Sequence, residues 1–225
     1  MRDDDHWARY NAHQGDRPIR EQCARVMSLA GPGAGRTAAD LGCGAGLETA
    51  ALLAAGWRVV AVDGEPGTPA RLSRAAGDRQ AMVTVRTTRF QDLSELPPTD
   101  LIYAGYSLPF QTRSSFDPLW TVLRASLRPG GRIAVDLFGD HDSWAGDPDM
   151  TFLTEAEARG LFDGLVIEHW HERDEPGTAF SGPKHWHVFE VIALQPLDGD
   201  LQTGRAETVD ERVTDPGRGG EHAAG

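Results

Sequence analysis

The chain has 225 residues and a formal net charge of −12. This length allows one α/β domain with a full core and excludes two large ones. An acidic surface repels phosphate backbones and anionic lipid, so neither nucleic acid nor a membrane surface is expected as a partner. No apolar run approaches membrane-spanning length, and the acidic, polar start is unlike a signal peptide, so we expect a cytoplasmic protein.

Apolar periodicity and turn residues predict alternating helices and strands. In chain order, we expect a helix over 17–30, a strand over 37–41, a helix over 46–55, a strand over 57–62, a helix over 68–76, strands over 82–87 and 100–105, a helix over 115–127, a strand over 132–138, a helix over 154–162, and strands over 165–172 and 185–194. Thr154 and Glu157 have the spacing of a capping box at the start of the last helix.

The last two predicted strands flank a turn-rich stretch that contains Pro176-Gly177 and Gly182-Pro183, which predicts an antiparallel hairpin. Strand–helix alternation followed by a hairpin favours an open α/β fold, with a mostly parallel sheet covered by helices on both faces. From Pro196 onward large apolar residues are few. We therefore expect a folded domain over 1–195 and a disordered acidic tail over 196–225.

A glycine-rich loop follows the first predicted strand and opens the next helix. Residues 40–46 read Asp-Leu-Gly-Cys-Gly-Ala-Gly, a context typical of nucleoside-binding loops. Glycine lets the backbone turn sharply and approach a ligand closely. Asp40 directly before the glycines disfavours a nearby phosphate and suits the ammonium of an amino-acid ligand.

Two further acids are expected at the carboxyl edge of the sheet. Asp63 ends the second strand, where a carboxylate can accept hydrogen bonds from both ribose hydroxyls. This position is shared by NAD and S-adenosylmethionine proteins, so it does not separate them. Asp92 follows the third strand and could accept from an adenine amino group, or could be a turn or cap residue.

Together these segments resemble the class I S-adenosylmethionine-dependent methyltransferases. The resemblance is carried by DLGCGAG (40–46), VVAVD (59–63), FQDL (90–93) and LRPGGRIAVDLFG (127–139). Within the class, the chain is similar to small methyltransferases of the tellurite-resistance type, through Trp7, Tyr10, Arg17-Pro18 and residues 106–110, 142–144 and 184–187. The family implies a Rossmann-like, doubly wound sheet of seven mostly parallel strands with an antiparallel last strand, and a small-molecule methyl acceptor.

The resemblance also implies which residues bind S-adenosylmethionine. The glycine loop would line the methionine part, Asp63 the ribose, and Gln91 and Asp92 the adenine. The full set of candidate cofactor-binding residues is Trp7, Tyr10, Arg17, Asp40, Gly42, Cys43, Gly44, Gly46, Asp63, Gly64, Gln91, Asp92 and Tyr106. Arg17 could meet the ligand carboxylate or be a solvated charge, and Trp7 and Tyr10 could instead pack on the core.

The candidate catalytic residues are His185, His187 and Tyr106. His185 and His187 alternate on the last strand and share one face, as His169 and His171 do on the preceding strand. If the hairpin pairs in register, the two pairs could approach one another. Three interpretations stay open, namely a structural role, substrate contact or general base, and a metal site. Lys184 is expected to be an exposed edge charge.

The leading hypothesis is a methyltransferase for a small-molecule acceptor such as a thiol, chalcogen anion, amine or hydroxyl, working as a monomer or homodimer without a bound metal. Methyl transfer from a sulfonium mainly requires collinear positioning, and a protonated nucleophile also needs a base. The alternatives are an NAD-dependent oxidoreductase with a related fold and a non-catalytic S-adenosylmethionine-binding protein.

Overall fold

The computed structural model describes residues 4–14 and 17–197. Its elements are α1 (Asp4–His13), α2 (Glu21–Ala30), β1 (Thr37–Leu41), α3 (Leu47–Ala54), β2 (Arg58–Asp63), α4 (Thr68–Ala76), η1 (Gly77–Met82), β3 (Val83–Thr87), η2 (Phe90–Asp92), β4 (Thr99–Ala104), α5 (Arg113–Ser126), β5 (Leu127–Phe138), α6 (Glu155–Gly160), β6 (Val166–Ala179) and β7 (Gly182–Leu194). Among these helices, none has both the length and the apolar character needed to cross a membrane.

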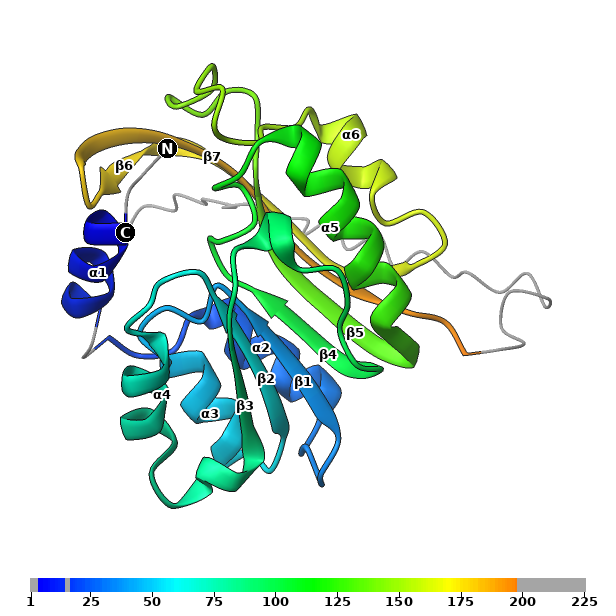
Figure 1. Ribbon diagram of the computed structural model, residues 1–225. Coiled ribbons are helices and arrows are strands. Elements are labelled where there is room, and N and C mark those ends of the chain that lie inside the picture. The colour runs from blue at the N-terminus through cyan, green and yellow to red at the C-terminus, as the bar shows by residue number, and fades with distance from the viewer. Residues whose placement is uncertain (1–3, 15–16, 198–225) are drawn as a thin grey trace, which may run out of the picture.

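The strands form one seven-stranded sheet in the order β3-β2-β1-β4-β5-β7-β6 (Figure 1). The pairs from β3 to β5 are all parallel, and β7 is antiparallel to both β5 and β6. The predicted fold class is confirmed, including the antiparallel last strand. The strand order reverses between β1 and β4, the point where open α/β sheets bind ligands beyond their carboxyl ends.

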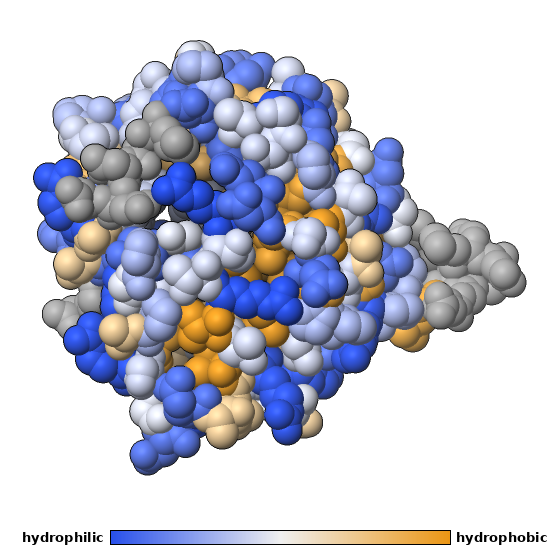
Figure 2. All heavy atoms as spheres, in the orientation of Figure 1, coloured by the Kyte–Doolittle hydropathy of each residue, from blue (hydrophilic) through white to orange (hydrophobic). Residues whose placement is uncertain are grey.

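Two apolar layers cover the sheet. On one face, α2, α3 and α4 pack through Cys23, Leu52 and Leu72, among others. On the other face, α5 and α6 pack through Phe116, Leu119 and other buried residues. Hydrophilic side chains cover most of the surface seen in Figure 2, and apolar atoms emerge in its middle. The fold therefore has the three-layer architecture that the alternating pattern favours.

The N-terminal part differs from the prediction. Helix α1 was not predicted, and the helix expected from residue 17 begins at Glu21. Pro18 favours an extended backbone at the residue before it. Arg20 is extended too, and its backbone N–H donates to the Glu48 carboxylate at 3.1 Å. A tertiary contact thus fixes a helix start that periodicity alone places too early.

The closing hairpin is also longer than predicted. Pro176-Gly177 and Pro183 lie inside β6 and β7, and the turn is confined to the residues around Phe180. Strand β6 is at the edge of the sheet, where a proline does not remove a ladder hydrogen bond. In Figure 1 the hairpin tip reaches over α1. The predicted disordered tail over 196–225 falls, apart from Pro196 and Leu197, outside the described residues.

The other predicted elements agree with the structure to within a few residues, apart from the last parallel strand, β5, which starts earlier. Helix α6 begins with the predicted capping box, because the Thr154 side chain accepts from the Glu157 N–H while the Glu157 carboxylate accepts from the Thr154 N–H.

Candidate functional site

A cleft of about 230 Å³ opens at the carboxyl edge of the sheet, between the ends of β1, β2 and β4. Its walls come from α1, the glycine loop, the end of β2, η2 and the loop after β4. Most of the predicted cofactor-binding residues line it, namely Trp7, Tyr10, Arg17, Asp40, Gly42, Cys43, Gly44, Asp63, Gly64, Gln91 and Tyr106. The fold thus brings residues from five distant segments to one place.

The glycine loop makes a sharp bend between β1 and α3. Gly42 and Gly44 have φ angles of 72° and 50°, in the left-handed region that favours glycine. The Gly42 N–H donates to the Val62 carbonyl at 2.7 Å, which ties the bend to the end of β2. A Cβ at Gly42 would overlap the Ser107 side chain. Glycine is therefore required here by conformation and by space.

Asp63 lies beside this bend, as the sequence predicts. Its carboxylate accepts the Gly44 N–H and the Glu65 N–H, each at 2.9 Å. Burial raises the pKa of Asp63, and the two backbone donors oppose that rise. A carboxylate can accept about four hydrogen bonds, so one lone pair on each oxygen remains for a ligand. The donors hold the group in a fixed orientation at the wall of the cleft.

Asp40 is a second acid of the cleft, and it is 2% exposed. The Thr49 hydroxyl donates to its Oδ2 at 2.5 Å. Burial raises the pKa of Asp40 to about 7, and the Thr49 hydrogen bond only partly opposes the rise. A cationic ligand group next to this carboxyl would favour its ionised form.

Arg17 has a protein partner. Its guanidinium forms two hydrogen bonds with the Glu48 carboxylate, at 2.6 and 2.9 Å. This pair ties the segment before α2 to the first turn of α3. The sequence left open whether Arg17 meets a ligand or solvent. The structure shows instead an ion pair with Glu48, which is 31 positions away and has no local sequence signal.

The two adenine candidates are placed differently. Gln91 lines the cleft together with Phe90. Asp92 is exposed and is not part of the cleft wall, because η2 turns its side chain away. Gly46 is likewise behind the wall and packs against Leu72 of α4. In a single turn of 3-10 helix, neighbouring side chains point in different directions, and sequence spacing alone does not select between them.

Helix α1 covers the glycine bend. Asn11 is 5% exposed, and its Oδ1 lies so close to Gly44 that a Cβ there would be 2.8 Å away. Trp7 and Tyr10 project from the same helix into the cleft wall, and their rings meet edge to face at 5.9 Å. Asn11 was missed because a polar residue in an unpredicted helix has no sequence signal.

Tyr106 follows β4 with a φ angle of 50°, unusual for a non-glycine residue. Its backbone N–H donates to Asp136 at 3.0 Å, and its hydroxyl accepts from Arg173 at 2.7 Å and lies 3.4 Å from Glu190. Burial raises the pKa of the Tyr106 phenol. The phenol therefore stays protonated at neutral pH and acts as a wall and hydrogen-bonding group of the cleft.

The paired histidines lie away from the cleft, and neither His185 nor His187 lines it. Alternation along β7 places them on the face of Phe189 and Val191, which belong to the α5–α6 layer. His169 and His171 are paired with Ile192 and Glu190 instead of with these histidines. The expectation that the two pairs approach one another is wrong, because the hairpin is longer and its register is shifted.

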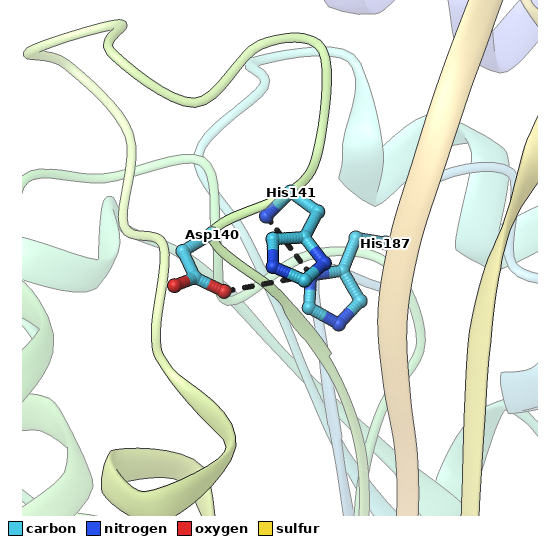
Figure 3. A group of neighbouring side chains, drawn as sticks. All are labelled: Asp140, His141 and His187. Carbon is cyan, nitrogen blue, oxygen red and sulfur yellow. Dashed lines mark hydrogen bonds and ion pairs between the residues drawn. The ribbon is translucent and has the colours of Figure 1, made fainter.

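His187 stacks on His141 at 4.6 Å and lies near Asp140 (Figure 3). Its Nδ1 accepts the His141 backbone N–H at 3.0 Å, so the ring hydrogen is on Nε2, which lies 2.9 Å from a Glu172 oxygen. His187 belongs to two groups of three potential metal ligands. One group includes Asp140 and His141, and the other includes Glu172 and Asp174. Both ring nitrogens of His187 already have hydrogen-bond partners, which favours the structural interpretation of this residue.

Lys184 is not the exposed edge charge that was expected. It is 5% exposed and forms an ion pair with the buried Asp142. Its ammonium lies 3.8 Å from the Trp144 ring centroid and 4.5 Å from that of Trp186. A loop after β5 folds over the strand and buries the lysine, which strand position alone does not reveal.

Comparisons with known proteins give one family match and several similar folds. Residues 38–131, from β1 to the turn in β5, match a sequence family described as a methyltransferase domain. No sequence among the curated proteins matches the chain.

Three similar solved structures share the fold. TehB from Haemophilus influenzae has a TM-score of 0.67 at 16% identity, over 79% of this chain and 62% of that one. NodS, an N-methyltransferase from Bradyrhizobium japonicum WM9 solved with S-adenosylhomocysteine, has 0.62 at 18%, over 83% and 97%. The Burkholderia thailandensis 1,6-didemethyltoxoflavin-N1-methyltransferase, solved with 1,6-didemethyltoxoflavin and S-adenosylhomocysteine, has 0.59 at 22%, over 79% and 77%. The chain thus spans less than two thirds of the TehB chain.

Proposed function

From the match of residues 38–131 to a methyltransferase domain, we propose that this chain is an S-adenosylmethionine-dependent methyltransferase that acts on a small-molecule acceptor. The observation that carries the proposal is the Asp63 carboxylate, oriented by the Gly44 and Glu65 N–H groups beside the glycine bend, with lone pairs left for a ribose. A dinucleotide would place a phosphate near Asp40, which lies in the wall of the same cleft.

The residues of the cleft fit S-adenosylmethionine in their chemistry. Asp63 would accept from the ribose hydroxyls, Asp40 would face the ammonium, and Phe90 and Gln91 would lie along the adenine. The cofactor supplies an electrophilic methyl group on a sulfonium. The aromatic rings of Trp7 and Tyr106 favour a neighbouring cation electrostatically.

The bound cofactor would give its methyl carbon to the acceptor's nucleophilic atom, and the electron pair of the broken carbon–sulfur bond would stay on sulfur. A proton, where the nucleophile carries one, leaves for solvent. The protein's contribution is orientation and exclusion of water, since the pKa of Tyr106 is too high for a base and neither His185 nor His187 lines the cleft. A small acceptor is supported by the Burkholderia structure, which was solved with one.

The oligomeric state, the domain boundary and the cellular location also belong to this proposal. We propose a cytoplasmic monomer or homodimer with one catalytic domain over 1–195. The net charge of −12 supports an acceptor other than nucleic acid.

Separate calorimetric titrations with S-adenosylhomocysteine and NADH test the proposal. We expect saturable binding of the first alone, weakened by about 100-fold in Asp63→Ala, because two backbone donors and the ribose contacts lose their acceptor. The matched control is Asp92→Ala, which removes the same group from an exposed position and should change the affinity less than about twofold. Binding of NADH alone would reverse the assignment.

A second measurement separates an enzyme from a binding protein. The protein is incubated with S-adenosylmethionine and a panel of thiols, amines, phenols and chalcogen anions, and methylated products are detected by mass spectrometry. Turnover with at least one acceptor, lost in Asp63→Ala, supports catalysis. Binding without turnover across the panel would make the chain a non-catalytic binding protein.

A further inference from the structure

A second chamber, of about 440 Å³, adjoins the cleft. Six residues line both cavities, among them Trp7, Tyr106 and Arg20, so the two spaces are direct neighbours. The volume is within the range of small-molecule sites. We propose that this chamber binds the methyl acceptor, and that the acceptor is a planar aromatic compound carrying a carboxylate held by Arg20 and Arg173. The inference rests on the proposed function and names its substrate class.

The walls of the chamber are aromatic on three sides. Trp7 and Tyr10 come from α1, Tyr106 from the loop after β4, and Trp186 and Phe180 from the hairpin. Tyr106 and Trp186 meet edge to face at 5.8 Å, and Phe180 meets Tyr10 in the same way at 5.9 Å. Phe180 is 50% exposed although it is large and apolar. Flat rings facing a cavity provide the offset-stacked and edge contacts that an aromatic ligand prefers.

The charged lining of the chamber is cationic. Arg20 and Arg173 reach it, and within the described part of the chain no acidic side chain does. This sign is opposite to that of the whole protein, whose net charge is −12. A locally positive site favours an anionic ligand, because the two arginines offset the repulsion between an anion and the negative net charge of the protein.

Both arginines are held at Tyr106. The Arg20 guanidinium carbon lies 4.7 Å from the Tyr106 ring centroid, and Arg173 donates to the Tyr106 hydroxyl. The Arg173 guanidinium carbon is 5.2 Å from the centroid of the Trp186 ring. These contacts orient the two cations and leave their charge without a paired anion.

Neither guanidinium forms an ion pair with a carboxylate among the described residues, whereas Arg17, Arg71 and Arg132 each do. In addition, the Arg173 Nε is buried without a hydrogen-bond partner in that part of the chain. A buried donor without an acceptor is costly. A bidentate carboxylate is the ligand group that matches such a guanidinium in charge and geometry.

Three acids lie near these arginines without lining the chamber, namely Asp136, Glu190 and Glu48, the last of which is paired with Arg17. Glu190 lies 3.4 Å from the Tyr106 hydroxyl and Asp136 accepts its backbone N–H, and neither residue lines the chamber. They help to hold Tyr106 in place. The open side of both guanidinium groups is therefore available to an acceptor.

Binding of two matched probes tests this inference without knowledge of the natural acceptor. Full-length protein saturated with S-adenosylhomocysteine is titrated with naphthalene-2-carboxylate and with its neutral amide, naphthalene-2-carboxamide. We expect the carboxylate to bind at least about tenfold more tightly, since hydrogen-bonded charges contribute more than neutral ones. Cyclohexanecarboxylate, which has the charge without the flat ring, should also bind more weakly.

The variants Arg20→Gln and Arg173→Gln should each weaken the binding of naphthalene-2-carboxylate by about tenfold and leave the affinity for naphthalene-2-carboxamide unchanged. Arg74→Gln, which removes the same charge from the exposed face of α4, is the matched control. Binding of S-adenosylhomocysteine by each variant shows that it is folded. If the protein binds S-adenosylhomocysteine but does not prefer the acid to the amide, the inference is wrong. If it does not bind S-adenosylhomocysteine at all, the proposed function fails instead.

Discussion

The two neighbouring cavities of this protein are built in different ways. In the cleft, the proposed ribose and ammonium contacts come from one continuous stretch, β1–α3–β2, in which the bend at Gly42 and the carboxylate of Asp63 are 21 positions apart. The chamber is assembled from α1, the loop after β4 and the β6–β7 hairpin, which are far apart in the chain. Local geometry specifies these contacts of the first cavity, whereas long-range packing specifies the second cavity.

This difference indicates how the sequence specifies the proposed cofactor site and the proposed acceptor site. A common cofactor requires the same bend and carboxylate wherever it binds, so its site has a sequence pattern. An acceptor site needs only a wall of suitable chemistry, which rings and cations from any segment can supply. Changes in the cleft should therefore be severe and depend on backbone geometry, whereas changes in the chamber should alter electrostatics and selectivity.

The largest effect is expected at the bend. Gly42→Ala adds a Cβ where φ is 72° and where the Ser107 side chain is already in contact. Strain and overlap together should lower the free energy of unfolding by about 2–5 kcal/mol. Gly35→Ala is the matched control, since its φ is 82° but nothing lies within 4 Å of the added atom. It should cost only about 1–2 kcal/mol in urea unfolding, and equal losses in both variants would contradict the role of close approach.

The next effect concerns Asp136, a buried acid that accepts the Tyr106 backbone N–H. Burial and the nearby Glu190 raise the pKa of Asp136 to about 8, against about 3.9 in an unfolded chain. The folded state therefore binds the extra proton, and stability falls as the pH rises from about 4 to about 8. Between pH 5 and pH 7 the wild type should lose about 1–3 kcal/mol relative to Asp136→Asn. Parallel pH dependences of urea unfolding for the two proteins would show that Asp136 is ionised in the fold.

A smaller effect is expected for Asp40 in the cleft. Its pKa of about 7 means that the carboxyl is partly protonated near neutral pH, and an ammonium ligand needs the ionised form. The affinity for S-adenosylhomocysteine should fall by roughly tenfold from pH 7.5 to pH 6. Calorimetry on Asp40→Asn should show weaker binding without this pH dependence. A wild-type affinity that does not change over this range would place the ammonium away from Asp40.

The smallest effect is expected at the two faces of β7. His185→Ala should change the affinity for naphthalene-2-carboxylate by less than about twofold, because His185 lies outside both cavities and its ring is hydrogen-bonded to Asp174. Trp186→Leu, one position further along, should weaken it by about threefold to tenfold through loss of a ring contact. The opposite order of effects would mean that the histidine face, and not the tryptophan face, meets the acceptor.

The sequence by itself determined the parallel sheet, most of the elements and the glycine bend of the cleft. Apolar strands, glycine breaks and the D-x-G-x-G-x-G loop are local signals, because backbone conformation there depends on residues a few positions apart. Asp40 and Asp63, predicted from their positions at strand ends, line the cleft, as does Gln91, which the family resemblance implied. Asp92, also predicted from a strand end, does not line it.

Only the tertiary structure decided the chamber. Helix α1, the partnership of Arg17 with Glu48, the burial of Lys184 and the convergence of Arg20 with Arg173 depend on contacts between distant segments. The hairpin shows the physical reason most clearly. Adjacent positions on a strand face opposite sides of the sheet, so sequence could identify a pair of histidines but not which side of β7 faces the acceptor space.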